Sequence, residues 1–164
     1  MDVAALYYEL ADDVGKNRER LLDGLEAGLR HADLVVGPET ATVGVGPDPE
    51  AVRAAAEPLD GETVTRAGAV VDRLGGAAVF GLPERTDGEV YNACVLLAPE
   101  EEPRVYRQRE YPHTYAWTTA YGEDRVFEAV GGRVAPAICA ELSFREKRRF
   151  LVSSGADVVV APAN

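Results

Sequence analysis

Two side chains that could carry out chemistry each come directly after an apolar run. Cys139 follows residues 134–138, and a segment of helical character comes after it. Glu39 follows the apolar residues 34–38 in the same way. Open α/β sheets usually carry their chemistry at the carboxyl ends of their strands. A thiol placed there can act as a nucleophile, and we expect Glu39 to face the same substrate.

Each of these residues also has an ordinary structural interpretation. Free cysteine is among the most buried residue types, so Cys139 taken alone could simply pack in the core. Glu39 taken alone could be a helix-start carboxylate or a solvated loop residue. Cys94 lies inside an apolar run, and we expect it to be core. We expect Asn92 to satisfy backbone groups near a turn and not to touch substrate.

The apolar runs predict strands that alternate with helices. Strands are expected at residues 3–8, 33–38, 77–82, 90–98, 103–107, 125–130, 133–138 and 156–161, and helices at 17–29, 49–56, 62–74 and 142–153. Asp87 and Gly88 predict a turn that makes residues 77–98 an antiparallel pair. Gly131 and Gly132 predict a second hairpin turn. The pattern is typical of an α/β sheet layered with helices.

Three local expectations follow from side-chain types. Asn17 is a plausible N-cap for the first helix, whose leucines recur at helical spacing. The last helix is expected to be amphipathic, with its basic residues, Lys147 among them, on the solvent side. The segment 110–123 is rich in aromatic residues and could be a substrate wall or a lid packed on the core.

Composition narrows the class of protein. The 164 residues carry a formal net charge of −11, which argues against binding to nucleic acid or to anionic membrane. No apolar run approaches the ~20 residues of a membrane helix, and the N-terminus lacks a secretory signal, so we expect a cytoplasmic protein. The two cysteines and two histidines show no metal-type spacing, and we expect neither a disulfide nor a metal.

An ordered set of motifs resembles the nitrilase superfamily of carbon–nitrogen hydrolases. The matching segments lie in the family's order over nearly the whole chain: Asn17-Arg18, residues 32–39, 81–84, 91–93, 105–107, 137–146, and 155–160 with Pro162 and Asn164. The segment around Cys139 is the strongest match. No single motif is decisive, but the ordered set is specific.

The resemblance implies an α-β-β-α sandwich and a catalytic cysteine, glutamate and lysine. Cys139 falls on the position of the nucleophile and Glu39 on that of the general base. The backbone N–H of Ala140 is the natural candidate for an oxyanion donor. The family acts on small non-peptide amides, nitriles or carbamoyl groups, needs no cofactor and commonly assembles through dimers. We therefore expect a small amide or nitrile as substrate and a homo-oligomer.

Departures from the family pattern concern the other polar positions. Gln108 stands where the lysine belongs, and it carries no charge. Arg107 and Arg109 flank it, but neighbouring side chains of a strand point to opposite faces, so neither can replace the lysine without a shift in register. The accessory glutamate of the family aligns with Tyr115, although Glu110 and Glu123 lie near. Glu141 replaces the more usual aspartate.

Length is a further departure, because family members continue well beyond the strand at 156–161. We interpret residues 1–164 as a single, incomplete carbon–nitrogen hydrolase domain that lacks the C-terminal part of the sandwich. It could be a fragment, could receive its missing half from another chain, or could pair with itself. Two functions follow: a hydrolase that works through a cysteine thioester, or a catalytically impaired member that serves in binding or assembly.

Overall fold

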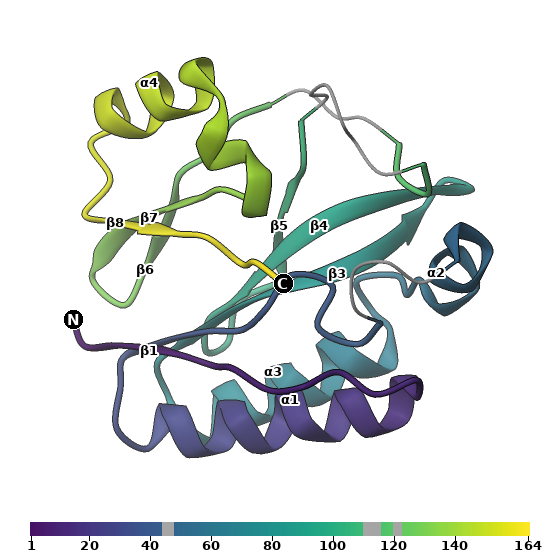
Figure 1. Cartoon of the computed structure of the whole chain (residues 1–164). Coiled ribbons are helices and arrows are strands. Elements are labelled where there is room, and N and C mark those ends of the chain that lie inside the picture. The colour runs from purple at the N-terminus through teal and green to yellow at the C-terminus, as the bar shows by residue number, and fades with distance from the viewer. Residues whose placement is uncertain (44–47, 110–115, 120–122) are drawn as a thin grey trace.

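Two β-sheets and four α-helices make up the computed structural model, which describes residues 1–43, 48–109, 116–119 and 123–164 (Figure 1). The first sheet contains β1 (Val3–Ala5), β2 (Leu34–Val36), β3 (Ala77–Thr86), β4 (Glu89–Leu97) and β5 (Arg104–Arg107). The second contains β6 (Phe127–Ala129), β7 (Gly132–Pro136) and β8 (Val158–Val160). The helices are α1 (Val14–Leu29), α2 (Pro49–Ala55), α3 (Glu62–Leu74) and α4 (Arg145–Ser153), and a 3₁₀ helix, η1 (Cys139–Ser143), precedes α4.

Strand order places the candidate residues at the middle of the molecule. The first sheet runs β1-β2-β3-β4-β5, with parallel pairing up to β3 and antiparallel pairing beyond it. β2 lies between β1 and β3, and both of its faces are covered, with Val35 in the core beside the helices and Leu34 in the core between the sheets. This cover explains its continuous apolar sequence. In the second sheet β7 pairs antiparallel with β6 and parallel with β8. Glu39 follows β2 and Cys139 follows β7, so each comes after an inner strand of its sheet.

Four layers result, each joined to the next by apolar packing, and the predicted α-β-β-α sandwich is confirmed. α1 and α3 cover the outer face of the first sheet through a core that includes Leu25, Val71 and Phe80. The two sheets face each other across a second core, which includes Cys94 and Ile138. Ala135, Ala137 and Leu151 pack the second sheet against α4. Figure 1 shows α1 and α3 below the sheets and α4 above them.

Several predicted boundaries differ from those of the structure. α1 begins three residues earlier than expected, because Asp13 is its N-cap and accepts a hydrogen bond from the backbone N–H of Lys16 at 2.8 Å. Asn17 is not the cap: it is fully buried within the helix, and its side chain bonds the backbone of Ala11 and Thr42. It therefore anchors the loop that follows Glu39. β1 and β8 are each shorter than predicted.

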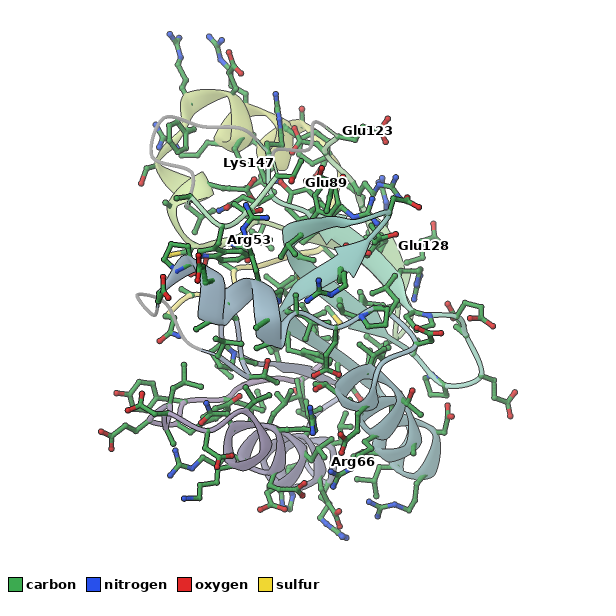
Figure 2. All side chains as sticks on the ribbon, turned by 90° about the vertical axis from the view of Figure 1, so that its right-hand side faces the viewer. Arg53, Arg66, Glu89, Glu123, Glu128 and Lys147 are labelled. Atoms are coloured by element: carbon green, nitrogen blue, oxygen red, sulfur yellow. The ribbon has the colours of Figure 1, made fainter. Side chains whose placement is uncertain are left out.

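The prediction that Lys147 faces solvent is wrong. α4 exposes Arg145, Arg148 and Arg149, but the Lys147 side chain is fully buried (Figure 2). Lys147 lies four residues before the buried Leu151 and therefore on the same, inner side of α4. That side of the helix faces polar groups as well as the apolar core. Among the described residues, no helix is both long and apolar enough to cross a membrane.

Gly81 on β3 permits the close approach that positions Glu39. A Cβ atom at Gly81 would lie 2.5 Å from the backbone nitrogen of Thr40 and 2.6 Å from the Cα of Glu39. The Gly81 backbone also bonds this loop on both sides, donating to the carbonyl of Pro38 and accepting from the N–H of Ala41, each at 2.9 Å. Glycine is therefore required at this position.

We expect Gly81→Ala to lower the free energy of unfolding by about 1–3 kcal/mol, because the added methyl group collides with rigid backbone. Gly68→Ala in α3 is the control: nothing lies within 4 Å of the place that its added methyl group would occupy, and alanine favours helix. That change should leave stability unaltered or raise it slightly. Chemical denaturation of the two variants checks this, and equal stabilities would contradict the assigned packing.

Candidate active site

Glu39 is held in a loop that departs from ordinary backbone geometry. Pro38 ends the ladder of β2, and Thr40 has a φ of 43°, in the left-handed region that non-glycine residues rarely occupy. The Glu39 side chain is completely buried. A buried carboxylate in a strained loop is costly, and such features are concentrated at functional sites.

Cys139 lies at an equally unusual position. β7 ends at Pro136, and η1 begins at Cys139, whose φ is 44°. Its thiol is partly exposed, in contrast to Cys94, which is fully buried in the core as expected. The left-handed backbone turns the chain sharply at the end of the strand, where a nucleophile is accessible.

The segment after β8 joins the two positions. The carbonyl of Pro162 accepts from the N–H of Cys139 at 2.9 Å, and the carbonyl of Ala163 accepts from the N–H of Glu39 at 3.4 Å. The Asn164 side chain also donates to the carbonyl of Glu39, at 3.4 Å. Residues a hundred positions apart in the sequence are thereby brought together between the two sheets.

The carboxylate of Glu39 acts on the pKa of the Cys139 thiol. Burial is the largest influence and raises that pKa, and the charge of Glu39 raises it further. Backbone N–H groups of Asn164 and Ala140 act in the opposite direction on the pKa, by stabilising the thiolate. Burial also raises the pKa of Glu39, which makes it a stronger base than an exposed glutamate. The thiol therefore keeps its proton and faces a base able to receive it.

Asn92 holds Glu39 in place, contrary to the expectation that it bonds only backbone groups. Its side-chain nitrogen donates to Oε1 of Glu39 at 2.8 Å and to Oε1 of Gln108 at 3.1 Å. Oε2 of Glu39 has no hydrogen-bond partner among the described residues. That oxygen is the one left to take a proton from Cys139.

Gln108 lies in the same cluster, directly opposite Asn92. Its backbone N–H donates to the carbonyl of Asn92 at 2.8 Å, and its side-chain nitrogen lies 3.4 Å from the carbonyl of Ile138. It is 8% exposed and places no positive charge beside Glu39. The structure therefore brings together four polar side chains: Glu39, Asn92, Gln108 and Cys139.

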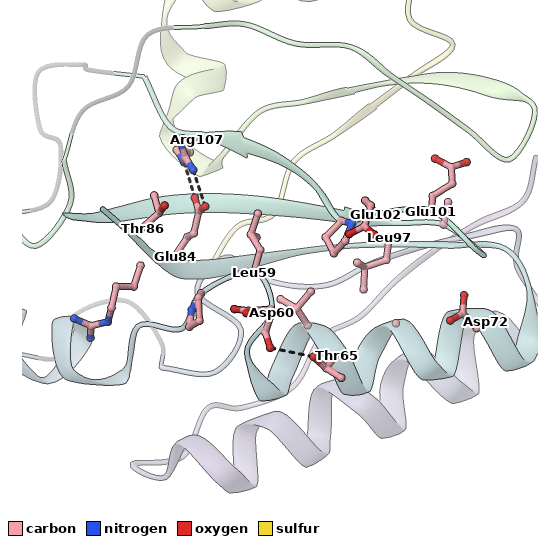
Figure 3. A pocket seen from close by; sticks show the side chains of 16 residues that line it. Leu59, Asp60, Thr65, Asp72, Glu84, Thr86, Leu97, Glu101, Glu102 and Arg107 are labelled. Carbon is pink, nitrogen blue, oxygen red and sulfur yellow. Dashed lines mark hydrogen bonds and ion pairs between the residues drawn. The ribbon is translucent and has the colours of Figure 1, made fainter. Parts of the chain in front are cut away.

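The neighbouring arginines do not reach this cluster. Arg107 forms a two-pronged ion pair with Glu84, at 2.6 and 2.7 Å, on the helix side of the first sheet (Figure 3). Arg109 pairs with Asp124 at 2.8 Å. A cavity of about 600 Å³ between α3 and the outer strands is lined by Glu84 and Arg107, but not by Glu39 or Cys139. It lies on the other face of the sheet from the candidate site.

The other side chains expected at the site contribute little within the described part of the chain. Tyr115 and Glu110 lie outside the described residues. Glu123 is exposed and pairs with Arg125 at 3.3 Å. No cluster of three or more potential metal ligands occurs within the described ranges. Asn92 could have been predicted from its spacing, since it faces the same side of β4 as the core residue Cys94 (two positions along).

Comparisons with known proteins find relatives over most of the chain. A family model described as carbon–nitrogen hydrolase matches residues 3–164. A hydrolase in the pqqF 5′ region of Pseudomonas protegens is 33% identical over 160 residues, covering 92% of this chain and 54% of that protein. An (R)-stereoselective amidase of Pseudomonas is 30% identical over 154 residues, covering 90% and 54%.

A solved structure shows the same arrangement of elements. It is a CN-hydrolase superfamily protein of Xanthomonas campestris, described with an arsenic adduct in the active site. It is 27% identical, with a TM-score of 0.76, and the match covers 98% of this chain and 63% of that one. The chain thus spans about half of the length of the curated relatives it matches.

Proposed function

The chain belongs to the carbon–nitrogen hydrolase family, and from that premise we propose that it hydrolyses a small amide through a thioester on Cys139. The observation that carries the proposal is geometric: the Cys139 turn and the buried Glu39 are bonded to one segment, residues 162–164. One oxygen of that carboxylate has no hydrogen-bond partner among the described residues. Amide nitrogen leaves poorly, and covalent catalysis divides the hydrolysis into two easier steps. A nitrile is the alternative substrate of the same site.

In the first step Glu39 accepts the thiol proton while the sulfur attacks the carbonyl carbon. A C–S bond forms, and the carbonyl oxygen takes the electron pair. When the oxygen returns that pair, the C–N bond breaks and Glu39 delivers its proton to the departing nitrogen. The raised pKa of Glu39 suits this double use, because the group must both accept and release a proton near neutral pH.

The developing oxyanion needs donors beside the sulfur. The backbone N–H of Ala140 already interacts with the Cys139 side chain and lowers its pKa, so it points toward the reacting region. Loss of one such donor typically costs a factor of about 10²–10³ in rate. The side-chain N–H of Gln108 is the other donor available at the cluster, although it lies at hydrogen-bonding distance from the carbonyl of Ile138.

In the second step water replaces the sulfur. Glu39, again deprotonated, takes a proton from the water as its oxygen attacks the thioester, and the C–S bond breaks. The proton then returns to the Cys139 thiolate, which restores both groups and releases the acid. These steps require no cofactor, and the acidic surface favours neither nucleic acid nor anionic membrane as a partner.

If Cys139 is the nucleophile, Cys139→Ala should abolish ammonia release from simple amides. Glu39→Gln should lower kcat by about 10³-fold or more, because the thiol loses its base. Cys94→Ala is the matched control: the chain's other cysteine is fully buried in the core, and its loss should leave a folded variant active. Ammonia release that survives Cys139→Ala would overturn the assignment.

A second candidate function is supported by Gln108. The site contains no cation facing Glu39 among the described residues, and the hydrogen-bonding groups of Gln108 are engaged by Asn92 and Ile138. A protein with this substitution could bind amides weakly and act as an assembly subunit within a homo-oligomer. Slow or undetectable turnover by an otherwise folded protein with a reactive Cys139 would favour this function.

We expect Gln108→Lys to raise kcat at least tenfold, because an ammonium at this position stabilises negative charge far better than a neutral amide. Gln108→Met, which is similar in size and uncharged, should not raise it. Steady-state ammonia release compares the variants. An active protein in which the lysine has no effect would show that Gln108 does not face the reacting atoms.

A further inference from the structure

Lys147 is a buried lysine that the proposed reaction does not use. Its side chain is fully buried on the inner side of α4, although lysine is almost never buried without a partner. The ammonium donates to the Tyr106 hydroxyl at 2.9 Å and to Oδ1 of Asp124 at 2.8 Å. It also lies 4.1 Å from the centre of the Tyr106 ring. The charge of Lys147 and two of its three N–H donors are therefore satisfied inside the protein.

The Tyr106 hydroxyl links Lys147 to a second buried charged side chain, Glu141. The hydroxyl donates to Oε1 of Glu141 at 2.6 Å, and Oε2 of Glu141 lies 4.0 Å from the Lys147 ammonium. Glu141 is completely buried, as are Tyr106 and Lys147. The carboxylate thus has a cation close by, with a hydroxyl between them.

Glu141 in turn holds the backbone that presents the nucleophile. Oε2 accepts from the N–H of Ile138 at 2.6 Å, immediately before Cys139. Oε1 accepts from the N–H of Arg109 at 3.0 Å, immediately after Gln108. One carboxylate therefore joins the strained turn at Cys139 to the end of β5. The series Lys147–Tyr106–Glu141–Ile138 ends one residue from the sulfur.

The charges in this series also act on the site. Glu141 raises the pKa of Glu39, in the same direction as burial does. At Cys94 the two charges oppose each other: Glu141 raises the pKa of that thiol and Lys147 lowers it, while burial is the largest influence. At Cys94, Lys147 therefore offsets a negative charge that would otherwise act alone.

We propose that Lys147 is a positioning residue for Cys139, which acts through Tyr106 and Glu141 to hold the turn at the nucleophile and to neutralise the buried carboxylate behind it. The inference rests on the proposed role of Cys139 and extends it to a cation that approaches from α4. The ammonium does not touch the reacting atoms. Its partner Tyr106 lies two residues before Gln108, and the two side chains face the same side of β5.

Titratable and charged groups surround this series on every packed element, and all bear on a test by pH. Those facing it are Cys94 of β4, Arg109 after β5, Asp124 before β6 and Glu39 after β2. Arg109 and Lys147 share the two oxygens of Asp124, at 2.8 Å each. Loss of the Lys147 charge therefore makes the net charge of the cluster of Arg109, Asp124 and Glu141 more negative.

The test measures alkylation of Cys139 by iodoacetamide across pH in the full chain, with site-resolved mass spectrometry. Lys147→Met keeps the length of the side chain and removes its charge. We expect the alkylation rate near neutral pH to fall roughly tenfold and the pH profile to move to higher pH, because the thiolate loses a compensating charge. Arg149→Met, which removes a cation from the exposed side of the same helix, should behave like the wild type.

Tyr106→Phe is a second variant, which deletes only the hydroxyl. It serves as the test if Lys147→Met does not fold. It should shift the alkylation profile in the same direction, and the double variant should be no slower than Lys147→Met, because both changes break one connection. Wild-type alkylation profiles in both folded single variants would overturn the proposal, even if their melting temperatures fall. Alkylation needs no turnover, so the result stands apart from whether the protein releases ammonia.

Discussion

The complete burial of the Glu39 carboxylate is the constraint on which the rest of this structure depends. A carboxylate loses a large hydration energy when it leaves water, and it stays in place only if surrounding groups compensate. Among the described residues, the compensation comes from one hydrogen bond donated by Asn92 and from the influence of the Cys139 thiol. Because the compensation is partial, the proton affinity of the carboxylate is raised. A single group that serves first as a base and then as an acid requires this property. Gly81 and the carbonyl of Ala163 determine where that carboxylate lies.

A second buried carboxylate shows how the same fold satisfies a charge fully. Glu141 accepts from two backbone N–H groups and from the Tyr106 hydroxyl, with Lys147 behind it. The two glutamates thus differ in environment: one is surrounded by donors and serves the backbone, and the other retains an oxygen for chemistry. Removing one partner from such a buried network lowers the free energy of unfolding by more than the network contributes to it, because the remaining charge is left without compensation.

Much of the fold could be predicted from the sequence, because apolar runs and turn residues determine most of its elements. The strands at Glu39 and Cys139, and the hairpin turn at Asp87 and Gly88, follow from local pattern. The prediction for Asn17 is wrong because Asp13, four residues earlier, caps the helix. The prediction for Lys147 is wrong because its partners Tyr106 and Asp124 are distant in the sequence, and local periodicity contains no information about such partners. The same reason hid the bond between Asn92 and Glu39, which spans 53 positions. The catalytic roles of Cys139 and Glu39 remain proposals that chemistry must test.

The pH dependence of Cys139 alkylation in the wild type and in Glu39→Gln tests the central claim most directly. The charge of Glu39 raises the pKa of the thiol, whereas burial raises it in either protein. Removal of the charge should therefore move the alkylation profile to lower pH and speed modification near neutral pH. A profile that stays in place, or moves to higher pH, would show that the thiol and the carboxylate do not form one site.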